Sequence, residues 1–463
     1  MTLHRRTLLG ATAAAGLVAA GAPFASAIPV DDWKNPGLTT VTDNAKLALP
    51  PGFKAKRVST IGVEPLLSGR GGKVVGRTPS TLDGTGCFEV NGGLRLVRNH
   101  ENRSTAAVPV PLVAGTVYDA GVPGGMGGCT VVETTSDGTF VQQWVGLSGT
   151  IRSCAGGVTP WGSWLSCEED TTKAGTAVVS SVDGKTYTTQ KDHGYVFEVF
   201  PDGTQIPEPI KAFGRATWEG AAIGPDRTTA YLTEDTGGGH LYRWTAPAGR
   251  TLKAGIARDF GPNDGQLHAA QLVRNGKALV HFGELSQADV DKPYKVTWIS
   301  GGTDRQAQQT PLRNQFAGAT VHPKVEGCWS DGTGLWFTLS YVNTAEATKY
   351  GIDEDQGMIM YYNYATETLT LKFTYHAGDY FDGPDNITVS PWGTLVVAED
   401  GSDPNHLIAW NKTRGTLPLA KDLVERGEWA GPCFNESGTV LFASVQSDCT
   451  YAITGPIKEL LTR

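Results

Sequence analysis

The sequence predicts an all-β chain that forms a single β-propeller, with six as the favoured number of blades. Most of the chain consists of short runs rich in Val, Leu, Tyr, Phe and Trp, broken by glycine turns. A tight-turn pattern recurs along the whole length, and no long linker, charge block or low-complexity tract interrupts it. Evenly distributed strand-turn units are typical of propellers, whose four-stranded blades stand around a central channel.

The turns share one pattern, in which a D/N-G dipeptide or an equivalent makes a tight turn that an alternating apolar strand often follows. Such dipeptides favour the turns that connect antiparallel strands. The segments are SDGTF from residue 136, PDGTQ from 201, PDRTTAYLTED from 225, RNGKALVHFGE from 274, SDGTGLWFTLS from 330, SPWGTLVVAED from 390 and NESGTVLFASV from 435. Six blades would average about 73 residues each. Five or seven blades, or a two-sheet sandwich with a second domain, are the alternatives.

The first 27 residues resemble an export signal. They carry no acid, have a basic start and an apolar middle, and end in A-S-A, which describes a cleaved signal rather than a membrane anchor. The adjacent Arg5 and Arg6 resemble a twin-arginine signal, whose pathway exports folded proteins. An ordinary Sec signal with a chance arginine pair is the alternative. We therefore expect one mature domain over 28–463, exported by the twin-arginine machinery to the periplasm or exterior.

Charge and hydropathy argue against two classes of partner. Cleavage after Ala27 would leave 436 residues and remove two arginines but no acid, which moves the formal net charge from −8 to −10. An acidic chain without a lysine/arginine block argues against nucleic acid or an anionic membrane as partner. No later segment is long and apolar enough to span a bilayer, so we expect no stable membrane association. A monomer is the default expectation.

Carboxylates follow predicted strands in four places, at Asp170, Asp235, Glu284 and Asp400. If these strands occupy equivalent places in different blades, their ends meet near the central axis. Clustered carboxylates repel one another and are costly to bury unpaired, whereas calcium binds several of them at once. Solvated turns are the alternative for each acid taken alone. Further candidates are Glu101, Glu219, Glu326, Asp385 and Asn386, and the glycines after Glu219 and Glu326 would let the backbone turn sharply beside a ligand.

The segment CAGGVTPWGSWLSCEED, residues 154–170, contains two cysteines and therefore offers a thiolate as a candidate ligand beside the carboxylates. Calcium does not choose sulfur, so a Cys154 thiolate would select a softer metal such as iron or zinc. A disulfide with Cys167 is the alternative, because export permits disulfides. The chain has seven cysteines, so at least one is unpaired within the chain, and Cys433 with Cys449 is a plausible bridge.

Two further expectations come from the same segment. Alternation along a strand places Cys167 and Glu169 on one face and Glu168 on the other, so only one of the two glutamates should face the site. The pair Gly156 and Gly157 is expected to form a turn.

Seven segments together resemble the PhoX-type secreted alkaline phosphatases, in family order and across nearly the whole mature chain. They are LVRNHEN (96–102), SCAGGVTPWGSWLSCEED (153–170), HGYVFEV (193–199), GRATWEGAA (214–222), TEDTGGGHLYRW (233–244), DGPDNITVSPWGTLVVAEDG (382–401) and GPCFNESGTVLFASVQ (431–446). The resemblance implies a six-bladed propeller that hydrolyses phosphate monoesters with two ferric ions, Fe(III), and calcium ions, Ca²⁺. A twin-arginine signal is also typical of the family.

The resemblance also implies site residues. Cys154 would be the thiolate ligand of iron, with Glu169 and Glu219 as further ligands of the iron cluster. The ligands shared among iron and calcium would be Glu326, Asp385 and Glu399, and the weaker candidates are Asn386, Asp235, Glu101 and Asp400. Arg215, in the turn before Glu219, would grip the phosphate bidentately. A surface arginine that pairs with a local acid is the alternative.

The chain departs from the family pattern at two positions. Trp218 stands where the family commonly has histidine before the glutamate, and Ser153 where it commonly has asparagine before the cysteine. Both changes leave the ligands in place but bear on substrate range and activity. The alternative functions are a calcium-dependent propeller lactonase or esterase and a non-catalytic, calcium-stabilised binding propeller. Neither calls for a Cys154 ligand, so iron content separates them from a phosphatase.

Overall fold

The structure is a computed structural model, and it describes residues 38–40, 46–122, 126–352, 354, 357–375, 381–401, 404–411, 415–424 and 427–462. The predicted export signal, residues 1–27, lies outside these ranges. The described chain is built almost entirely from antiparallel strands, which confirms the all-β prediction. Its helices are short: α1 (Ile256–Asp259), α2 (Thr344–Tyr350), α3 (Ile457–Thr462), and the 3-10 turns η1 (Lys211–Phe213), η2 (Phe282–Glu284), η3 (Gln287–Asp289) and η4 (Leu312–Gln315). No described helix has the length and apolar character needed to cross a membrane.

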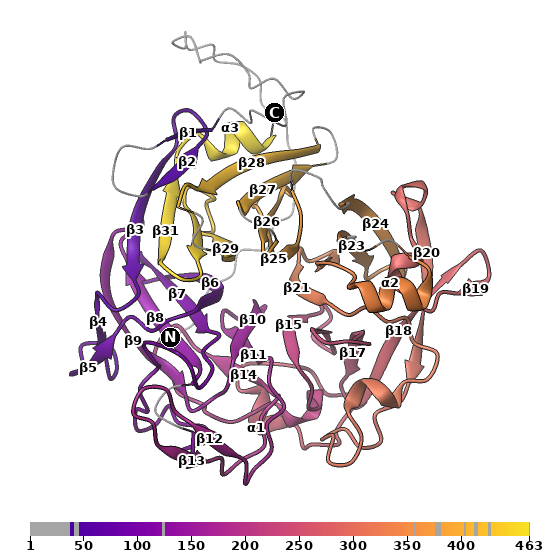
Figure 1. Ribbon diagram of the computed structural model, residues 1–463, viewed down its shortest axis with the longest axis horizontal. Helices are drawn as coiled ribbons and strands as arrows, with labels where there is room; N and C mark the ends of the chain where they lie inside the picture. Colours follow the sequence, from indigo (N-terminus) through magenta and orange to yellow (C-terminus); the bar gives the residue numbers. More distant parts are fainter. Residues whose placement is uncertain are drawn as a thin grey trace.

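The sheets stand around a common axis in a propeller-like arrangement (Figure 1). One sheet has the order β5 (Val74–Arg77), β4 (Pro65–Leu67), β9 (Phe140–Ser148), β8 (Gly128–Thr134), β7 (Gly93–His100), β6 (Leu82–Val90). The next contains β10 (Ser153–Val158), β11 (Trp164–Glu168) and β14 (Val196–Val199), with a hairpin of β12 (Ala177–Val179) and β13 (Thr186–Thr188) between β11 and β14 in the chain.

The largest sheet has ten strands, and both of its ends lie near the axis (Figure 1). Its order is β15 (Trp218–Ile223), β16 (Thr229–Glu234), β17 (Leu241–Thr245), β18 (Gln266–Arg274), β20 (Pro293–Ser300), β24 (Thr368–Tyr375), β23 (Gly357–Asn363), β22 (Gly334–Leu339), β21 (Val325–Ser330), with β19 (Lys277–Ala278) paired to β18. Strand β20 pairs with both β18 and β24, so it joins two four-stranded halves at their outer edges.

The N-terminal strands complete the last two sheets of the chain. Strands β1 (Thr39–Thr40) and β2 (Leu47–Leu49) extend the sheet of β28 (Gly415–Asp422), β27 (His406–Asn411), β26 (Leu395–Glu399) and β25 (Pro384–Val389). Strand β3 (Lys54–Thr60) pairs with β31 (Cys449–Thr454) in the sheet that also holds β29 (Trp429–Phe434) and β30 (Leu441–Val445). Pairing between the two ends of the chain therefore closes the ring.

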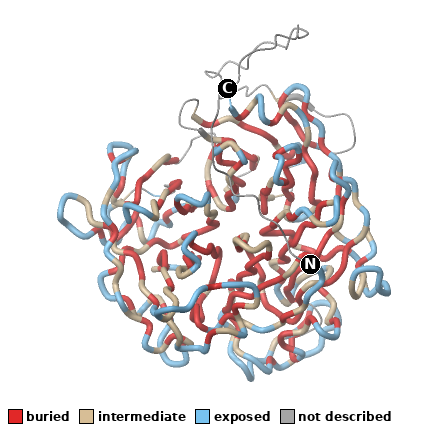
Figure 2. The backbone as a smooth tube through the Cα atoms, turned by 180° about the vertical axis from the view of Figure 1, so that it is seen from behind, coloured by how far each residue is buried: buried red, intermediate tan, exposed pale blue. Residues whose placement is uncertain are grey.

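Six strands line the axis, and we call them the inner strands: β6, β10, β15, β21, β25 and β29. Each contacts the next around a closed ring, because β29 also contacts β6. Buried residues run through the sheets, and exposed residues concentrate in the outer loops (Figure 2).

Trp218 belongs to the buried core and is 0% exposed. Its ring packs edge-on against Tyr242 with 5.3 Å between the ring centroids, and its indole N–H donates to the Gly214 carbonyl.

Candidate metal centre

Each inner strand carries a β-bulge near its start. Pairing with the neighbouring strand stops after Leu82, Ser153, Trp218, Val325, Pro384 and Ala430, and it resumes three residues later in every case. A bulge bends the strand and re-aims its side chains. The residues directly after the interruption are Asp83, Cys154, Glu219, Glu326, Asp385 and Gly431. The first five line one cavity, so a repeated backbone irregularity brings ligand-type side chains together from five strands.

The next residue in several of these strands must be small because the neighbouring inner strand is close. An added Cβ at Gly84 would lie 2.5 Å from Ala155 Cα, one at Gly220 would lie 2.8 Å from Cys328 Sγ, and one at Gly327 would lie 2.9 Å from Asn386 Cα. None of these three glycines has a positive φ. The glycine after Glu219 and Glu326 therefore permits close packing of the inner strands, not the sharp turn that was expected.

Gly156 and Gly157 lie inside β10 rather than in a turn, so that prediction is wrong. A Cβ on Gly156 would lie 1.8 Å from the Leu165 carbonyl oxygen of β11. A Cβ on Gly157 would lie 1.9 Å from the Ala221 carbonyl oxygen of β15. The two glycines thus let β10 approach its own sheet on one side and the next inner strand on the other.

The cavity has a volume of about 260 Å³, and most of its lining is charged. Its lining consists of the carboxyl groups of Asp83, Glu101, Glu169, Glu219, Asp235, Glu326, Asp385, Asp400 and Glu428, the thiol of Cys154, and the cations Arg103, Arg152 and Lys324. Nine carboxyl groups face three cations. Burial of such an excess of negative charge is unfavourable unless protons or bound cations offset it.

Each of the strands β11, β16 and β26 ends in an acidic residue, and a second acidic residue follows it directly. The two side chains of each pair point to opposite sides. The second acids, Glu169, Asp235 and Asp400, line the cavity. The first acids, Glu168, Glu234 and Glu399, are almost fully buried within the sheets. Successive side chains of a strand point to opposite faces, which is why only one acid of each pair can reach the axis.

Glu399, a predicted metal ligand, lies outside the lining of the cavity. Its carboxylate accepts hydrogen bonds from the backbone N–H groups of Asp382 (2.9 Å) and His406 (2.8 Å), and it does not line the cavity. Asp400, which was only a secondary candidate, lines the cavity in its place.

Four of the ligand-type carboxyl groups of the cavity have raised pKa values in the absence of metal. Burial and the nearby Glu101 raise the pKa of Asp83 to about 8, and burial and Asp235 raise the pKa of Glu326 to about 7. Burial, followed by repulsion from neighbouring carboxylates, holds the pKa values of Glu219 and Asp385 well above their ordinary range. A bound cation would lower these pKa values, because it stabilises the charged form of each ligand.

Three groups of ligand atoms lie close enough together to share metal ions. Within each group all ligand atoms lie within 4.8 Å of one another, and the groups are Asp83, Glu101 and Cys154; Cys154, Glu169 and Glu219; and Glu219, Glu326 and Asp385. Cys154 and Glu219 each belong to two groups. Among the described residues, Glu219 Oε1 is buried without a hydrogen-bond partner. Carboxylates with one thiol suit hard cations together with one softer metal ion.

Two partly buried cations, Lys324 and Arg152, contact the ligand-type carboxylates. Lys324 Nζ lies 2.7 Å from Asp235 Oδ2 and 2.9 Å from Glu326 Oε1. Arg152 lies 2.6 Å from Glu101 Oε1 and 2.5 Å from Glu169 Oε1. Burial would lower the pKa of Lys324, but the facing carboxylates outweigh it and raise the value, so the ammonium stays charged.

Arg215, which was predicted to contact phosphate, does not line the cavity. Its side chain is 2% exposed, and its guanidinium donates to four backbone carbonyls, those of Thr171, Thr172, His193 and Ala307. Two further candidates also lie outside the cavity lining. Asn386 Oδ1 accepts the Gly431 N–H at 2.8 Å, and Glu284 accepts the N–H groups of Val280 and His281.

The sequence analysis did not identify five residues of the cavity, which are Asp83, Arg103, Arg152, Lys324 and Glu428. Asp83 belongs to an apparent turn, TLDGTG, yet Asp83 and Gly84 lie within β6. Arg152 and Lys324 each stand two positions before a ligand, Cys154 and Glu326, and this period-2 spacing was a usable signal. Glu428 lies directly before β29, and no sequence motif identifies it as a site residue.

None of the seven cysteines forms a disulfide. Cys154 lies in the cavity with Sγ 3.7 Å from Asp83 Oδ2, and burial followed by the Asp83 charge raises its pKa well above the ordinary value. Cys167 is buried in the apolar core and does not pair with Cys154. The plausible bridge between Cys433 and Cys449 is also absent.

Comparisons with known proteins identify the family of the chain and a structure with a shared fold. The family model for alkaline phosphatase PhoX matches residues 35–448. A structure of Pseudomonas fluorescens PhoX in complex with vanadate, a transition state analogue, superimposes with a TM-score of 0.62 at 18% identity and covers 88% of this chain and 96% of that chain, which shows a shared fold. A gluconolactonase from Xanthomonas campestris reaches a TM-score of only 0.33 at 12% identity, with 81% and 86% of the chains covered. No curated protein matches the sequence. Because the family match spans most of its length, the chain belongs to the PhoX alkaline phosphatase family.

Proposed function

We propose that the chain is an exported phosphatase that hydrolyses phosphate monoesters in the axial cavity, with iron and calcium bound there. The observation that carries the proposal is the series of three ligand groups joined through Cys154 and Glu219, within a member of the PhoX family. The buried, unpartnered Glu219 Oε1 supports it, because such an oxygen is costly unless a cation or a donor meets it.

The donor types suggest which metal goes where. Cys154 offers the softest donor, so it would hold iron together with Glu169 and Glu219. The group of Glu219, Glu326 and Asp385 offers only oxygen and suits calcium. When bound, such cations polarise the phosphoryl group and offset its negative charge.

The side chains that would bind the ester are the three cations of the cavity. Arg152 and Lys324 are held by carboxylates of the cluster, so their charges stand beside the oxygens that a phosphate would present. Arg103, whose side chain is 58% exposed, lies 3.7 Å from Glu101 and would meet the substrate from the solvent side. No serine or cysteine nucleophile motif is required for this chemistry.

We also propose six blades, one for each inner strand, in a single domain over residues 28–463. The ten-stranded sheet then counts as two blades joined through β20. Export through the twin-arginine pathway accords with the proposal, because that pathway would allow the metals to bind before export.

The test is metal content together with phosphatase activity. The purified protein should contain both iron and calcium and should release p-nitrophenol from p-nitrophenyl phosphate at alkaline pH. A lactone substrate assayed in parallel addresses the lactonase alternative. Calcium without iron, and no phosphate release, would leave a lactonase or a binding propeller as the function.

A further inference from the structure

Glu168, the buried neighbour of Glu169, accepts hydrogen bonds from Ile151, which precedes β10, and from residues 193–195, which follow β11. Oε1 accepts the Ile151 N–H at 2.9 Å and faces His193 Nδ1 at 2.7 Å. Oε2 accepts the N–H groups of Gly194 (2.8 Å) and Tyr195 (3.2 Å). The end of β11 is thereby tied to residues 193–195, where the chain returns to the sheet.

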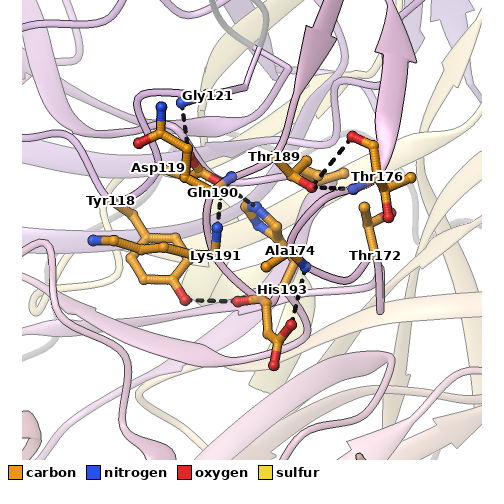
Figure 3. A network of polar contacts seen from close by, with 12 residues as sticks. Tyr118, Asp119, Gly121, Thr172, Ala174, Thr176, Thr189, Gln190, Lys191 and His193 are labelled. Atoms are coloured by element: carbon orange, nitrogen blue, oxygen red, sulfur yellow. Dashed lines mark hydrogen bonds and ion pairs between the residues drawn. The ribbon is translucent and has the colours of Figure 1, made fainter.

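His193 links Glu168 to a second buried carboxylate, Asp119. His193 Nε2 lies 3.3 Å from Asp119 Oδ2, which also accepts the N–H groups of Gln190 and Lys191, as Figure 3 shows. Burial alone would lower the pKa of His193, but the two carboxylates outweigh it and raise the value to about 9. The imidazolium therefore stands between two carboxylates with 0% side-chain exposure on all three.

Arg215 fixes the same segment from the other side. Its Nε donates to the His193 carbonyl at 2.6 Å, and one terminal nitrogen donates to the Thr171 carbonyl, only two residues after Glu169. The chain between β11 and β14 is thus held both where it leaves the sheet and where it returns. Glu169 lies at the point of departure, and its own N–H donates to the Arg152 carbonyl at 2.9 Å.

We propose that Glu168, His193, Asp119 and Arg215 are positioning residues that hold the Glu169 carboxylate at the metal cluster. The inference rests on the proposed metal-dependent function and names the support of one ligand of that site. A similar arrangement lies beside Asp400, where the preceding glutamate also contacts a histidine. The buried Glu399 accepts the N–H of His406 and faces its Nδ1 at 3.0 Å. Groups that orient a ligand in this way commonly change metal affinity about 10- to 100-fold when they are removed.

The test compares two glutamates of the same sheet. Glu198 on β14 is also buried and also has four donors, from Trp161, Ser163, Gly255 and Ile256, but it does not line the cavity or support a cavity residue. Glu168→Gln and Glu198→Gln should therefore lower the melting temperature of the metal-free protein by similar amounts. Iron affinity, measured by competition with a chelator and elemental analysis of the bound iron, should fall about 10- to 100-fold in Glu168→Gln only.

Asp119→Asn provides a second variant if Glu168→Gln does not fold, since it weakens the same network farther from Glu169 and should shift metal affinity in the same direction. Equal metal affinities for the wild-type protein, Glu168→Gln and Asp119→Asn would overturn the positioning role. So would an equal loss in Glu198→Gln, which would indicate general destabilisation. A wild-type protein that binds both metals but releases no phosphate contradicts the proposed function and leaves the positioning role intact.

Discussion

Gly157→Ala is the substitution that most directly tests the packing of the inner strands. The added methyl carbon would lie 1.9 Å from the Ala221 carbonyl oxygen, which belongs to the backbone of β15 and cannot rotate away. A carbon and a carbonyl oxygen ordinarily stay about 3.3 Å apart. Strands β10 and β15 would therefore have to separate by more than 1 Å at this point.

Overpacking of a core costs about 1–3 kcal/mol, and a clash with backbone belongs near the upper end of that range. For a chain of this size, about 3 kcal/mol corresponds to a fall in melting temperature of about 3 °C. Because β10 carries Cys154 and β15 carries Glu219, the same separation should weaken metal retention. Thermal melts of the metal-free protein and elemental analysis of the loaded protein measure the two effects.

Gly69→Ala is the matched control. Gly69 has no atom within 4 Å of an added Cβ and no positive φ, so its substitution should leave both the melting temperature and the metal content unchanged. If Gly157→Ala melts at the same temperature as Gly69→Ala, the close approach of the inner strands is not a constraint on the fold, and the reasoning is refuted.

Three further predictions concern the site. Cys154→Ser should lose iron and keep calcium, since the hydroxyl is a hard donor; full iron content by elemental analysis would remove Cys154 from the ligand set. Between about pH 4 and pH 8 the metal-free protein should become less stable as the pH rises, because the raised pKa values of Asp83 (about 8) and Glu326 (about 7) mean that the folded state binds more protons than the unfolded state. Urea titrations across this range measure how the free energy of unfolding changes with pH, and this dependence should flatten with saturating calcium. A free energy of unfolding that increases with pH would contradict the raised pKa values. Arg215→Met should destabilise the protein by about 2–4 kcal/mol, because it leaves several buried carbonyls unpaired, and at saturating metal it should not raise KM, whereas Arg103→Met should raise KM and leave the melting temperature unchanged. A raised KM for Arg215→Met at saturating metal would restore its predicted phosphate contact.

The strand-turn pattern was sufficient to predict the class of fold, because turns and alternation are local properties. The turn motifs at 225, 390 and 435 each lead into a strand of the structure, β16, β26 and β30. The motif at 274 does so only briefly, since β19 ends after two residues and His281 caps a 3-10 turn. That interruption depends on how the segment packs and leaves no mark in the dipeptide pattern.

The acids that end these strands could be identified as a group, but their individual roles could not. Adjacent acids such as Glu399 and Asp400 have the same chemistry, and which of them reaches the axis depends on the register of β26 against β25 and β27. Arg215 shows the same limit, since its partners are backbone carbonyls from three separate segments.

The sequence by itself determined the all-β architecture, the presence of acids at strand ends and of Cys154 as candidate ligands, and the family, because strand propensity, turn chemistry and family motifs lie in consecutive residues. Only the tertiary structure decided which side chains meet. Six bulges, set by the pairing of each inner strand with its neighbour, follow one another around the axis. Five of them turn Asp83, Cys154, Glu219, Glu326 and Asp385 toward one cavity, and the sixth supplies no ligand because Gly431 has no side chain. The register of pairing is a property of two strands at once, so neither strand alone can reveal it.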